Sequence, residues 1–394
     1  MKQEVAPFQG QFRFLPMDKV IFGRGSLSRL TGEINRLGSR RAFIITGTTL
    51  TREGLVRRIE ETLGPRWAGT FSGTHQHVPS QTVIAAAEAA RDAGADLLIS
   101  FGGGSPIDTT KAVAAVIGAG LQDRAALIGK LGTRLAANLT LLPQIAIPTT
   151  LSAAEFTPVA GVTDEDAHIK GGLSDERMTP RLVILDPELT VATGRELWAS
   201  TGIKALDHAV ESVYSTAHQP LTDAAALEAI RLLFAYLPHS VGEPPDLEAR
   251  AYCQIAAWLS IFGIANVRMG LSHALGHQIG ARCNIPHGVT SCITLPHVMR
   301  FLASATANRQ ALMAMAMGID TRGISPEAAA VAAAGAVEAL IRGLGLPHRL
   351  RDAGVSEADL ENIVRAAFPE ASRSNSPRPV GSEEELLQLL HHAW

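Results

Sequence analysis

The sequence has few cysteines, few aromatic residues and little charge of either sign. Its three cysteines are odd in number and too few for a disulfide framework, which excludes the class of small disulfide-stabilised domains. The absence of any run of about 18 apolar residues argues against a membrane-spanning helix. The net charge of −3 and the absence of a lysine- and arginine-rich run argue against nucleic acid as a partner. The N-terminal segment MKQEVAPFQG lacks the basic and apolar regions of a signal peptide, so we expect a cytoplasmic globular protein.

What the sequence does contain is enough apolar surface for two domains. It has 394 residues, 46% of them hydrophobic, and a domain usually takes roughly 100–200 residues. In the first half, short β-branched runs alternate with helical patterns. Strands are expected over residues 41–46, 95–101, 144–148 and 182–186, and helices over residues 82–93 and 106–118. This alternation is typical of βαβ units around a mainly parallel sheet.

The pattern changes after about residue 187, where long segments follow a helical period. Helices are expected over residues 221–236, 247–264 and 326–344, and the last of these is rich in alanine, which favours helix. We therefore predict an α/β domain over residues 1–186 and an all-helical domain over residues 187–394.

The sharpest local signal is the segment FGGGSPIDTTK, residues 101–111, where an expected strand runs into three glycines and then a helix. Ser105 is suited to cap that helix, Pro106 to be its first residue, and Asp108 has the spacing of a capping box. Glycines let backbone N–H groups approach an anion, and the helix dipole adds positive potential there. The segment therefore predicts a pyrophosphate site for a dinucleotide, with a tight turn without ligand as the alternative. Lys111, two turns into the helix, could equally be a solvated side chain.

A second signal is a group of histidines in the expected helical domain, within the segment LSHALGHQIGARCNIPH. His273 and His277 are four residues apart and share a helix face, and His287 follows a turn. Lys204 and His208 have the same spacing on an earlier helix. Two facing helices could bring His208, His273 and His287 to one point beside Lys204, where three imidazoles would suit a divalent transition metal with an open position. The alternative is that each histidine is a hydrogen-bonded core or surface residue.

Together these segments resemble the iron-containing (group III) alcohol dehydrogenase family, a superfamily that includes glycerol dehydrogenases, dehydroquinate synthases and maleylacetate reductases. GGGSPIDTTK is similar to the family's pyrophosphate loop, and HALGHQIGARCNIPHG to its histidine signature. The resemblance extends from VIFG (residues 20–23) through NSPRP (residues 375–379). It implies a Rossmann-like N-terminal domain, a helical C-terminal domain, and a cleft where NAD or NADP meets a small-molecule substrate. By analogy we also expect a homodimer or larger homo-oligomer.

The resemblance implies a set of cofactor-binding residues. They are Gly103, Gly104 and Ser105 with Asp108 in the pyrophosphate loop, Thr149 and Thr150 at the ribose and nicotinamide, and Lys170 near the cofactor. Gly47 stands where many family members carry an aspartate that binds the adenosine ribose and selects NAD. Because a glycine removes the repulsion against a 2′-phosphate, NADP is allowed as well as NAD.

The metal site is where the sequence departs from the family. The usual ligands are one aspartate and three histidines, and Lys204 stands at the aspartate position, four residues before His208. An ammonium group repels a divalent cation and cannot ligate it while protonated. We expect Asp207 to point to a different helix face and to be a poor substitute. We therefore expect no catalytic metal, although Fe or Zn could still bind through His208, His273 and His287.

The departure suggests a mechanism. Lys204 could place its positive charge at the substrate oxygen, as the metal does in other members. Maleylacetate reductases resemble this case, since they lack the aspartate and work without metal. The spacing of the segment PTTLSAAEFTP is also similar to that of maleylacetate reductases. The segments GGGSPID and PHG, in contrast, resemble the alcohol dehydrogenase branch. We expect a metal-independent NAD(P)H-dependent reductase of a small carbonyl or enone, similar to maleylacetate. Its expected catalytic residues are Lys204, His208 and His277, the last as proton donor or relay.

A dicarboxylate substrate would need cationic partners, and Arg268, Arg282 and Arg300 lie near the histidine segment. For each of them a surface salt bridge is the alternative. Three other functions stay open: a metal-dependent (Fe or Zn) alcohol dehydrogenase, a lyase or isomerase using Lys204 as Schiff-base or acid/base residue, and a non-catalytic cofactor-binding protein.

Overall fold

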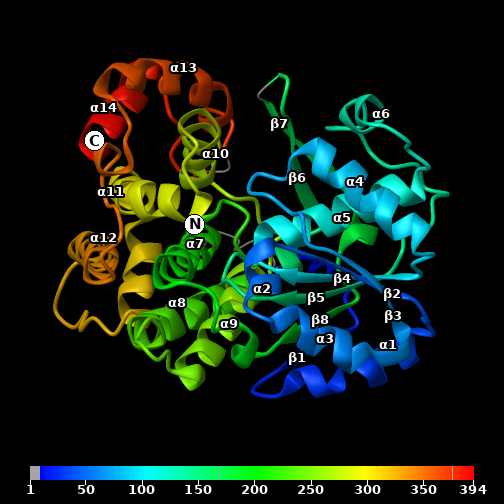
Figure 1. Cartoon of the computed structure of the whole chain (residues 1–394). Helices are drawn as coiled ribbons and strands as arrows, with labels where there is room; N and C mark the ends of the chain where they lie inside the picture. Colours follow the sequence, from blue (N-terminus) through cyan, green and yellow to red (C-terminus); the bar gives the residue numbers. More distant parts are fainter. Residues whose placement is uncertain (1–8, 168, 375) are drawn as a thin grey trace.

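The computed structural model describes residues 9–394 apart from His168 and Asn375. Figure 1 shows a sheet-containing half next to a helical half. Asn375, the first residue of the NSPRP segment, thus lies outside the described residues, as do residues 1–8. None of the helices in the described part of the chain is both long and apolar enough to span a bilayer.

A six-stranded parallel sheet organises the first half, in the order β1-β8-β5-β4-β2-β3. Its strands are β1 (Lys19–Phe22), β2 (Ala42–Thr46), β3 (Trp67–Phe71), β4 (Leu97–Gly102), β5 (Gln144–Pro148) and β8 (Leu182–Leu185). The helices of this half are α1 (Leu30–Leu37), α2 (Thr48–Arg52), α3 (Leu55–Leu63), α4 (Ser80–Asp92), α5 (Gly104–Gly118) and α6 (Arg124–Ile128).

Helices cover both faces of this sheet. Ala42 and Ile44 of β2 pack with α1 and α3 on one face, whereas Phe43 and Ile45 pack with α4 and α5 on the other. Because both faces are buried, the central strands are continuous apolar runs, which is why the sequence reveals them. The predicted parallel α/β arrangement is confirmed.

An antiparallel hairpin of β6 (Val159–Asp164) and β7 (Ile169–Ser174) forms a separate small sheet that the sequence did not predict. Its strands are rich in glycine and half-exposed, so neither β propensity nor an apolar run marks them. Figure 1 shows the hairpin rising from the sheet half on the side of α10 and α13. The short strands β1 and β3 were missed as well.

The second half is helical, as predicted. Its helices are α7 (Arg195–Tyr214), α8 (Pro220–Ser240), α9 (Leu247–Ile261), α10 (Leu271–Cys283), α11 (His287–Ala316), α12 (Pro326–Gly343), α13 (Leu360–Ala371) and α14 (Glu383–Ala393). Helix α7 is buried along almost its whole length and packs against α8, α9 and α11. From Trp198 to Tyr214 this helix has no exposed face, as expected of a helix at the centre of its domain.

The two halves meet in one continuous core. Val183 and Leu185 of β8 pack in the same apolar cluster as Trp198 and Leu206 of α7. Arg250 of α9 is buried and donates hydrogen bonds to backbone oxygens at residues 190 and 193 of the connection between β8 and α7. These contacts fix the start of α7 against the sheet. The domain boundary at residues 186 and 187 stays a prediction.

Candidate active site

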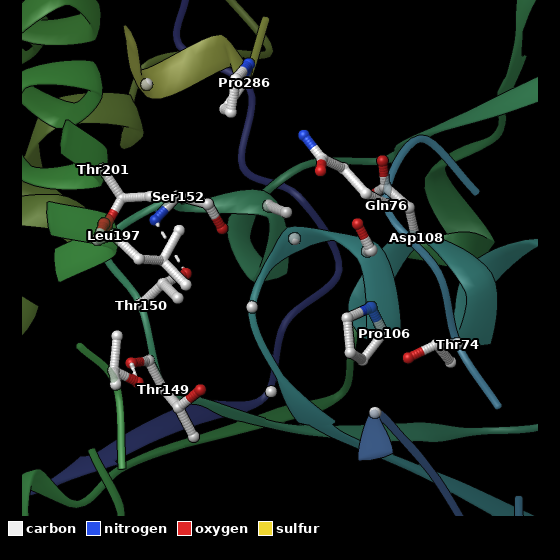
Figure 2. Close-up of a pocket in the computed structure, with 18 of the residues that line it drawn as sticks. Thr74, Gln76, Pro106, Asp108, Thr149, Thr150, Ser152, Leu197, Thr201 and Pro286 are labelled. Atoms are coloured by element: carbon white, nitrogen blue, oxygen red, sulfur yellow. Dashed lines mark hydrogen bonds between the residues drawn. The ribbon is translucent and has the colours of Figure 1, made fainter. Parts of the chain in front are cut away.

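A first cavity, cavity 1, lies at the carboxyl ends of β2, β4 and β5 and has a volume of about 680 Å³. This is where open α/β sheets bind ligands. On the sheet side its lining includes Gly47, Gly103, Gly104, Ser105, Asp108, Thr149, Thr150 and Lys170. The structure thus brings together all the predicted cofactor-binding residues. Figure 2 shows Thr149 and Thr150 on one side of the cavity, Pro106 and Asp108 on another, and Leu197 and Thr201 of α7 nearby.

The glycine loop differs from its predicted geometry in detail. Helix α5 begins at Gly104, its N-cap is Gly103, and no side chain caps it. The predicted cap at Ser105 and the capping box with Asp108 are therefore wrong, and Pro106 is the third residue of the helix instead of the first. Proline is tolerated there because the first four N–H groups of a helix have no intrahelical partner. The uncapped N–H groups remain available to an anion in cavity 1.

The loop glycines are required by close packing. A Cβ on Gly103 would lie 3.0 Å from Thr150 Cγ2, and one on Gly102, whose φ is +142°, would lie 2.7 Å from Pro106 Cγ. A side chain on Gly102 would push the loop away from the start of α5, and one on Gly103 would push it away from Thr150. The glycines therefore bring the backbone at the start of α5 close to Thr149 and Thr150, which directly follow β5.

Beneath the loop, a fully buried Lys111 lies next to a half-buried Asp108. Asp108 accepts a hydrogen bond from the backbone N–H of Gly161 in β6, 3.1 Å away, and lies 3.9 Å from Lys111 Nζ. The Lys111 ammonium donates to three oxygens, the backbone oxygens of Ala154 (2.6 Å) and Val159 (2.9 Å) and Thr157 Oγ1 (3.0 Å). The solvated alternative for Lys111 is wrong, because the side chain is fully buried. It ties α5 to the start of the hairpin.

A second cavity, cavity 2, adjoins the first and has a volume of about 1150 Å³. The two cavities share Asp108, Ala154, Lys170 and His287. Cavity 2 continues between the hairpin and helices α9, α10 and α13, where its lining includes His208, His273 and His277. Lys204 lines cavity 1, one turn before His208 on α7. The junction of the two cavities is thus surrounded by the predicted catalytic residues.

The four histidines form a chain of neighbouring rings. Ring centroids are 5.0 Å apart for His208 and His273, 6.3 Å for His273 and His277, and 5.9 Å for His277 and His287. Lys170 Nζ lies 3.2 Å from His287 Nε2. Burial and the charges of Lys170 and Lys204 lower the pKa of His287, so this imidazole is neutral at pH 7.

Asp207 faces the cluster, which corrects the prediction that it points elsewhere. Its Oδ2 lies 3.6 Å from Lys204 Nζ and accepts a hydrogen bond from Ser291 Oγ, 2.6 Å away. Asp207 follows Lys204 by three residues, a spacing that puts both on one helix face. Burial lowers the pKa of Lys204, while the charges of Asp207 and Glu211 act in the opposite direction.

Glu211 is a site residue that the sequence did not reveal. Its carboxylate lies 2.7 Å from His273 Nδ1 and accepts hydrogen bonds from the backbone N–H groups of Gly270 (2.8 Å) and Ser272 (2.7 Å). It therefore fixes the His273 ring and directs Nε2 of that ring away from the carboxylate. The signal that could have found it is helical spacing, because Glu211 lies four residues after Asp207 on α7.

Among the described residues, the ligand atoms of Asp207, Glu211 and His273 lie close enough together to hold a metal ion. This group is not the predicted set of His208, His273 and His287. Ser291 and Lys204 already contact Asp207, and backbone N–H groups already contact Glu211. The group is thus a buried ion and hydrogen-bond network around Lys204.

The outer part of cavity 2 is polar. His277 Nδ1 lies 2.8 Å from Glu370 Oε1 of α13, a partner that sequence reasoning missed. Of the three arginines predicted to hold a dicarboxylate, Arg282 lines cavity 2, whereas Arg300 pairs with Glu338 elsewhere. Arg268 lines neither cavity. For Arg300 the structure shows the alternative, a surface salt bridge.

Two family models match the chain. The model described as iron-containing alcohol dehydrogenase matches residues 17–187, and the C-terminal model of the Fe-containing alcohol dehydrogenase family matches residues 198–394. Lactaldehyde reductase of Escherichia coli K12 is 35% identical over 380 residues, covering 95% of this chain and 97% of the relative. Maleylacetate reductase 2 of Cupriavidus pinatubonensis is 34% identical over 376 residues, covering 95% and 94%.

Solved structures of similar proteins agree with these matches. A crystal structure of 1,3-propanediol oxidoreductase has a TM-score of 0.91 and 31% identity, covering 98% of this chain and 100% of that one. Maleylacetate reductase from Rhizobium sp. strain MTP-10005 has a TM-score of 0.80 and 29% identity, covering 99% of both chains.

Proposed function

The chain belongs to the iron-containing alcohol dehydrogenase family and is an NAD-dependent oxidoreductase, and from this premise we propose that it reduces a small carbonyl or enone compound, similar to maleylacetate, without a catalytic metal. The observation that carries the proposal is the position of Lys204. Its ammonium lies at the junction of the two cavities, in contact with the buried carboxylate of Asp207. Burial lowers the pKa of His208, His273 and His287, and the charge of Lys204 lowers the pKa of each of them further.

A divalent metal does not suit this arrangement. The three histidines that would ligate it all lie in the field of the Lys204 ammonium, and like charges this close repel strongly at low dielectric. The oxygen ligands that could offset that charge already bind Lys204, Ser291 and backbone N–H groups. Lys204 thus supplies the positive charge that a metal supplies in other oxidoreductases.

The residues around the junction can perform carbonyl reduction. Gly103, Thr149 and Thr150 of cavity 1 would hold a reduced nicotinamide dinucleotide, which would supply a hydride, and with it two electrons, to the substrate carbon. Lys204 stabilises the negative charge that develops on the substrate oxygen as the C=O π pair moves there. A carbonyl oxygen then takes one proton, from Lys204 or from His277 on the cavity 2 side, and the product is an alcohol. With an enone the hydride adds to the β carbon, the C=C pair moves towards the oxygen as an enolate that Lys204 stabilises, and protonation of the α carbon gives a saturated ketone. Asp207 holds Lys204, and Glu370 holds His277.

NADP is a second possible cofactor. Gly47 caps the short helix α2 and presents no carboxylate where an adenosine ribose would lie. Of the described residues that line cavity 1, Asp108 is the one acid, and it lies next to the hairpin. A 2′-phosphate at the Gly47 end would therefore meet no fixed negative charge.

Replacement of Lys204 combined with metal analysis tests the proposal. We expect Lys204→Ala to lower kcat about 10²–10³-fold, the typical effect of removing one donor to a developing oxyanion. Lys130→Ala, which removes an exposed lysine, is the control and should keep the wild-type rate. Lys204→Asp is expected to create dependence on added Fe²⁺ or Zn²⁺. Unchanged activity of Lys204→Ala would contradict the proposal, and so would borohydride trapping of substrate on Lys204.

A metal-dependent alcohol dehydrogenase is a second candidate, favoured by one observation. Glu211 contacts Nδ1 of His273, and a carboxylate on the far nitrogen is how proteins orient a metal-binding histidine. Protein purified without added metal should contain none under our proposal. Stoichiometric Fe or Zn in that preparation would establish the second candidate instead.

A further inference from the structure

The hairpin wall of cavity 2 contains two glycines that face each other across its strands. Gly161 of β6 pairs with Gly172 of β7, and both line the cavity. A Cβ on Gly172 would meet no atom within 4 Å, so this position opens directly into free space. A Cβ on Gly161 would lie 2.5 Å from Lys170 Cε, so the lysine stem lies over bare backbone. Glycine inside a strand often marks a place where a ligand approaches closely.

The opposite wall is apolar. Ile261 at the end of α9, and Ile264 and Met269 in the segment before α10, line the same cavity. A substrate chain passing between this wall and the hairpin would contact aliphatic groups on one side. On the other side it would contact the open backbone of Gly172 and the Lys170 stem that covers Gly161. The volume of about 1150 Å³ is slightly above the common range of ligand pockets, and well above the need of a two- or three-carbon aldehyde.

Arg282 supplies an uncompensated charge on this cavity. Both carboxylates that line cavity 2 already have partners: Asp108 contacts Lys111 and the Gly161 N–H, and Glu370 contacts His277 and Gln278. Within the described part of the chain, the Arg282 guanidinium has neither a hydrogen bond nor an ion pair, and it is exposed at the cavity. A guanidinium in this state is suited to bind a carboxylate or sulfonate through two hydrogen bonds.

We infer that cavity 2 binds an extended oxo acid, with its carbonyl at the Lys204 junction, its chain over Gly172 beside the Lys170 stem, and its distal anionic group on Arg282. This inference rests on the proposed function, because it names the substrate class of the same site. Electrons and protons move as in the reduction described above, and the distal anion takes no part in the transfer. Arg282 is a specificity residue, and Gly172 sets how long a chain the site accepts.

A pair of matched substrates tests the role of Arg282. The substrates are 4-oxobutanoate, its uncharged methyl ester, and the longer 6-oxohexanoate. We would measure the reduction of each at saturating NADPH and at saturating NADH. The proteins compared are the full-length wild type, Arg282→Met and Arg268→Met. We expect Arg282→Met to lower the acid-to-ester ratio of kcat/KM about ten- to hundredfold, mainly through KM of the acid. Arg268→Met removes an arginine outside both cavities and should keep the wild-type ratio. A sulfonate aldehyde run in parallel shows which anion is preferred.

Chain length tests the role of the glycine pair. We expect Gly172→Val to lower kcat/KM for 6-oxohexanoate at least tenfold more than for 4-oxobutanoate, because its side chain would occupy the open space. Ser174→Val places the same side chain two residues further along β7, outside the cavity lining, and should leave this ratio unchanged.

The possible failures are distinguishable. Absence of turnover of every aldehyde with either cofactor would overturn the proposed function. Turnover of acid and ester with a ratio that Arg282→Met does not change would overturn the subsite and leave the reductase intact. An equal effect of Gly172→Val on both chain lengths would overturn the path over Gly172.

Discussion

At the residue scale, the buried carboxyl group of Glu155 next to the cofactor loop makes stability depend on pH. Burial raises its pKa from 4.5 to about 7, and its Oε2 has no partner. Between pH 4.5 and 7 the unfolded carboxyl loses its proton while the folded one keeps it. The wild type therefore loses stability as pH rises through this window, by about 3 kcal/mol in total.

Glu155→Gln removes that titration. We expect the difference in thermal midpoint between Glu155→Gln and the wild type to shift in favour of the variant from pH 5 to pH 8, as measured by scanning calorimetry. Glu53→Gln, at an exposed position, is the control and should show little pH-dependent difference. If the thermal midpoints of Glu155→Gln and the wild type differ by the same amount at pH 5 and pH 8, the raised pKa of Glu155 is contradicted.

Gly47 carries a second residue-scale prediction, on cofactor choice. A Cβ there would lie 3.4 Å from Thr74 Oγ1, an ordinary contact, so Gly47→Asp should fold. Its carboxylate would repel a 2′-phosphate and accept a hydrogen bond from a 2′-hydroxyl. We expect the dissociation constant for NADPH to rise about tenfold and that for NADH to fall, measured by nicotinamide fluorescence. Equal effects on both cofactors would show that the adenosine ribose does not lie at Gly47.

Spacing along the helices predicted which histidines come together but not which carboxylates hold them. Lys204, His208, His273 and His277 follow from four-residue spacing, and the structure brings them together. The position of Asp207 next to His208 predicts a different helix face. Its spacing of three residues from Lys204 instead places its carboxylate next to the Lys204 ammonium. Glu370 lies on α13, far away in the sequence, so only tertiary structure could reveal it.

At the element scale, the glycine loop carries a prediction on cofactor affinity. Gly103→Ala would place a Cβ 3.0 Å from Thr150 Cγ2, so the loop or the threonine must shift by a few tenths of an ångström. We expect the dissociation constants of NADH and NADPH both to rise about tenfold, measured by calorimetric titration, because backbone N–H groups lose their position around the pyrophosphate. Gly335→Ala in α12, where a Cβ meets nothing, is the matched control and should leave both constants unchanged. If Gly103→Ala binds NADH and NADPH with wild-type affinity, the assignment of this loop to the cofactor site is contradicted.

Elements were predictable where burial on all sides leaves a continuous or periodic apolar pattern. Strand β5 matches its predicted bounds, and α12 ends one residue earlier than predicted. The hairpin was not predictable, because its glycines, which build the wall of cavity 2, are unfavourable in strands. The feature that escaped prediction is thus the one that shapes the substrate side of the site.

At the scale of the whole molecule, the site belongs to neither half alone. The sheet half supplies Gly103 and Thr150 to cavity 1, while the helical half supplies Leu197, Lys204 and Gly288. The change from sheet to helices was visible in the sequence as a change of period. The core that the two halves share was not visible in the sequence, because the contacts between β8 and α7 depend on how the helices fold back onto the sheet. The expected homo-oligomer stays a prediction that light scattering can test.

Because both halves line cavity 1, cofactor binding should stabilise them together. At a concentration a hundredfold above the dissociation constant, a ligand adds about 2.7 kcal/mol to the free energy of unfolding. We expect NADPH to slow hydrogen exchange in the loop before α5 and equally in the first turns of α7 and α11, where Leu197 and Gly288 line the cavity. Gly103→Ala at the same concentration should reduce protection in both places. Protection confined to the sheet half would show that the helical half does not contact the cofactor, and it would remove Lys204 from the reacting centre.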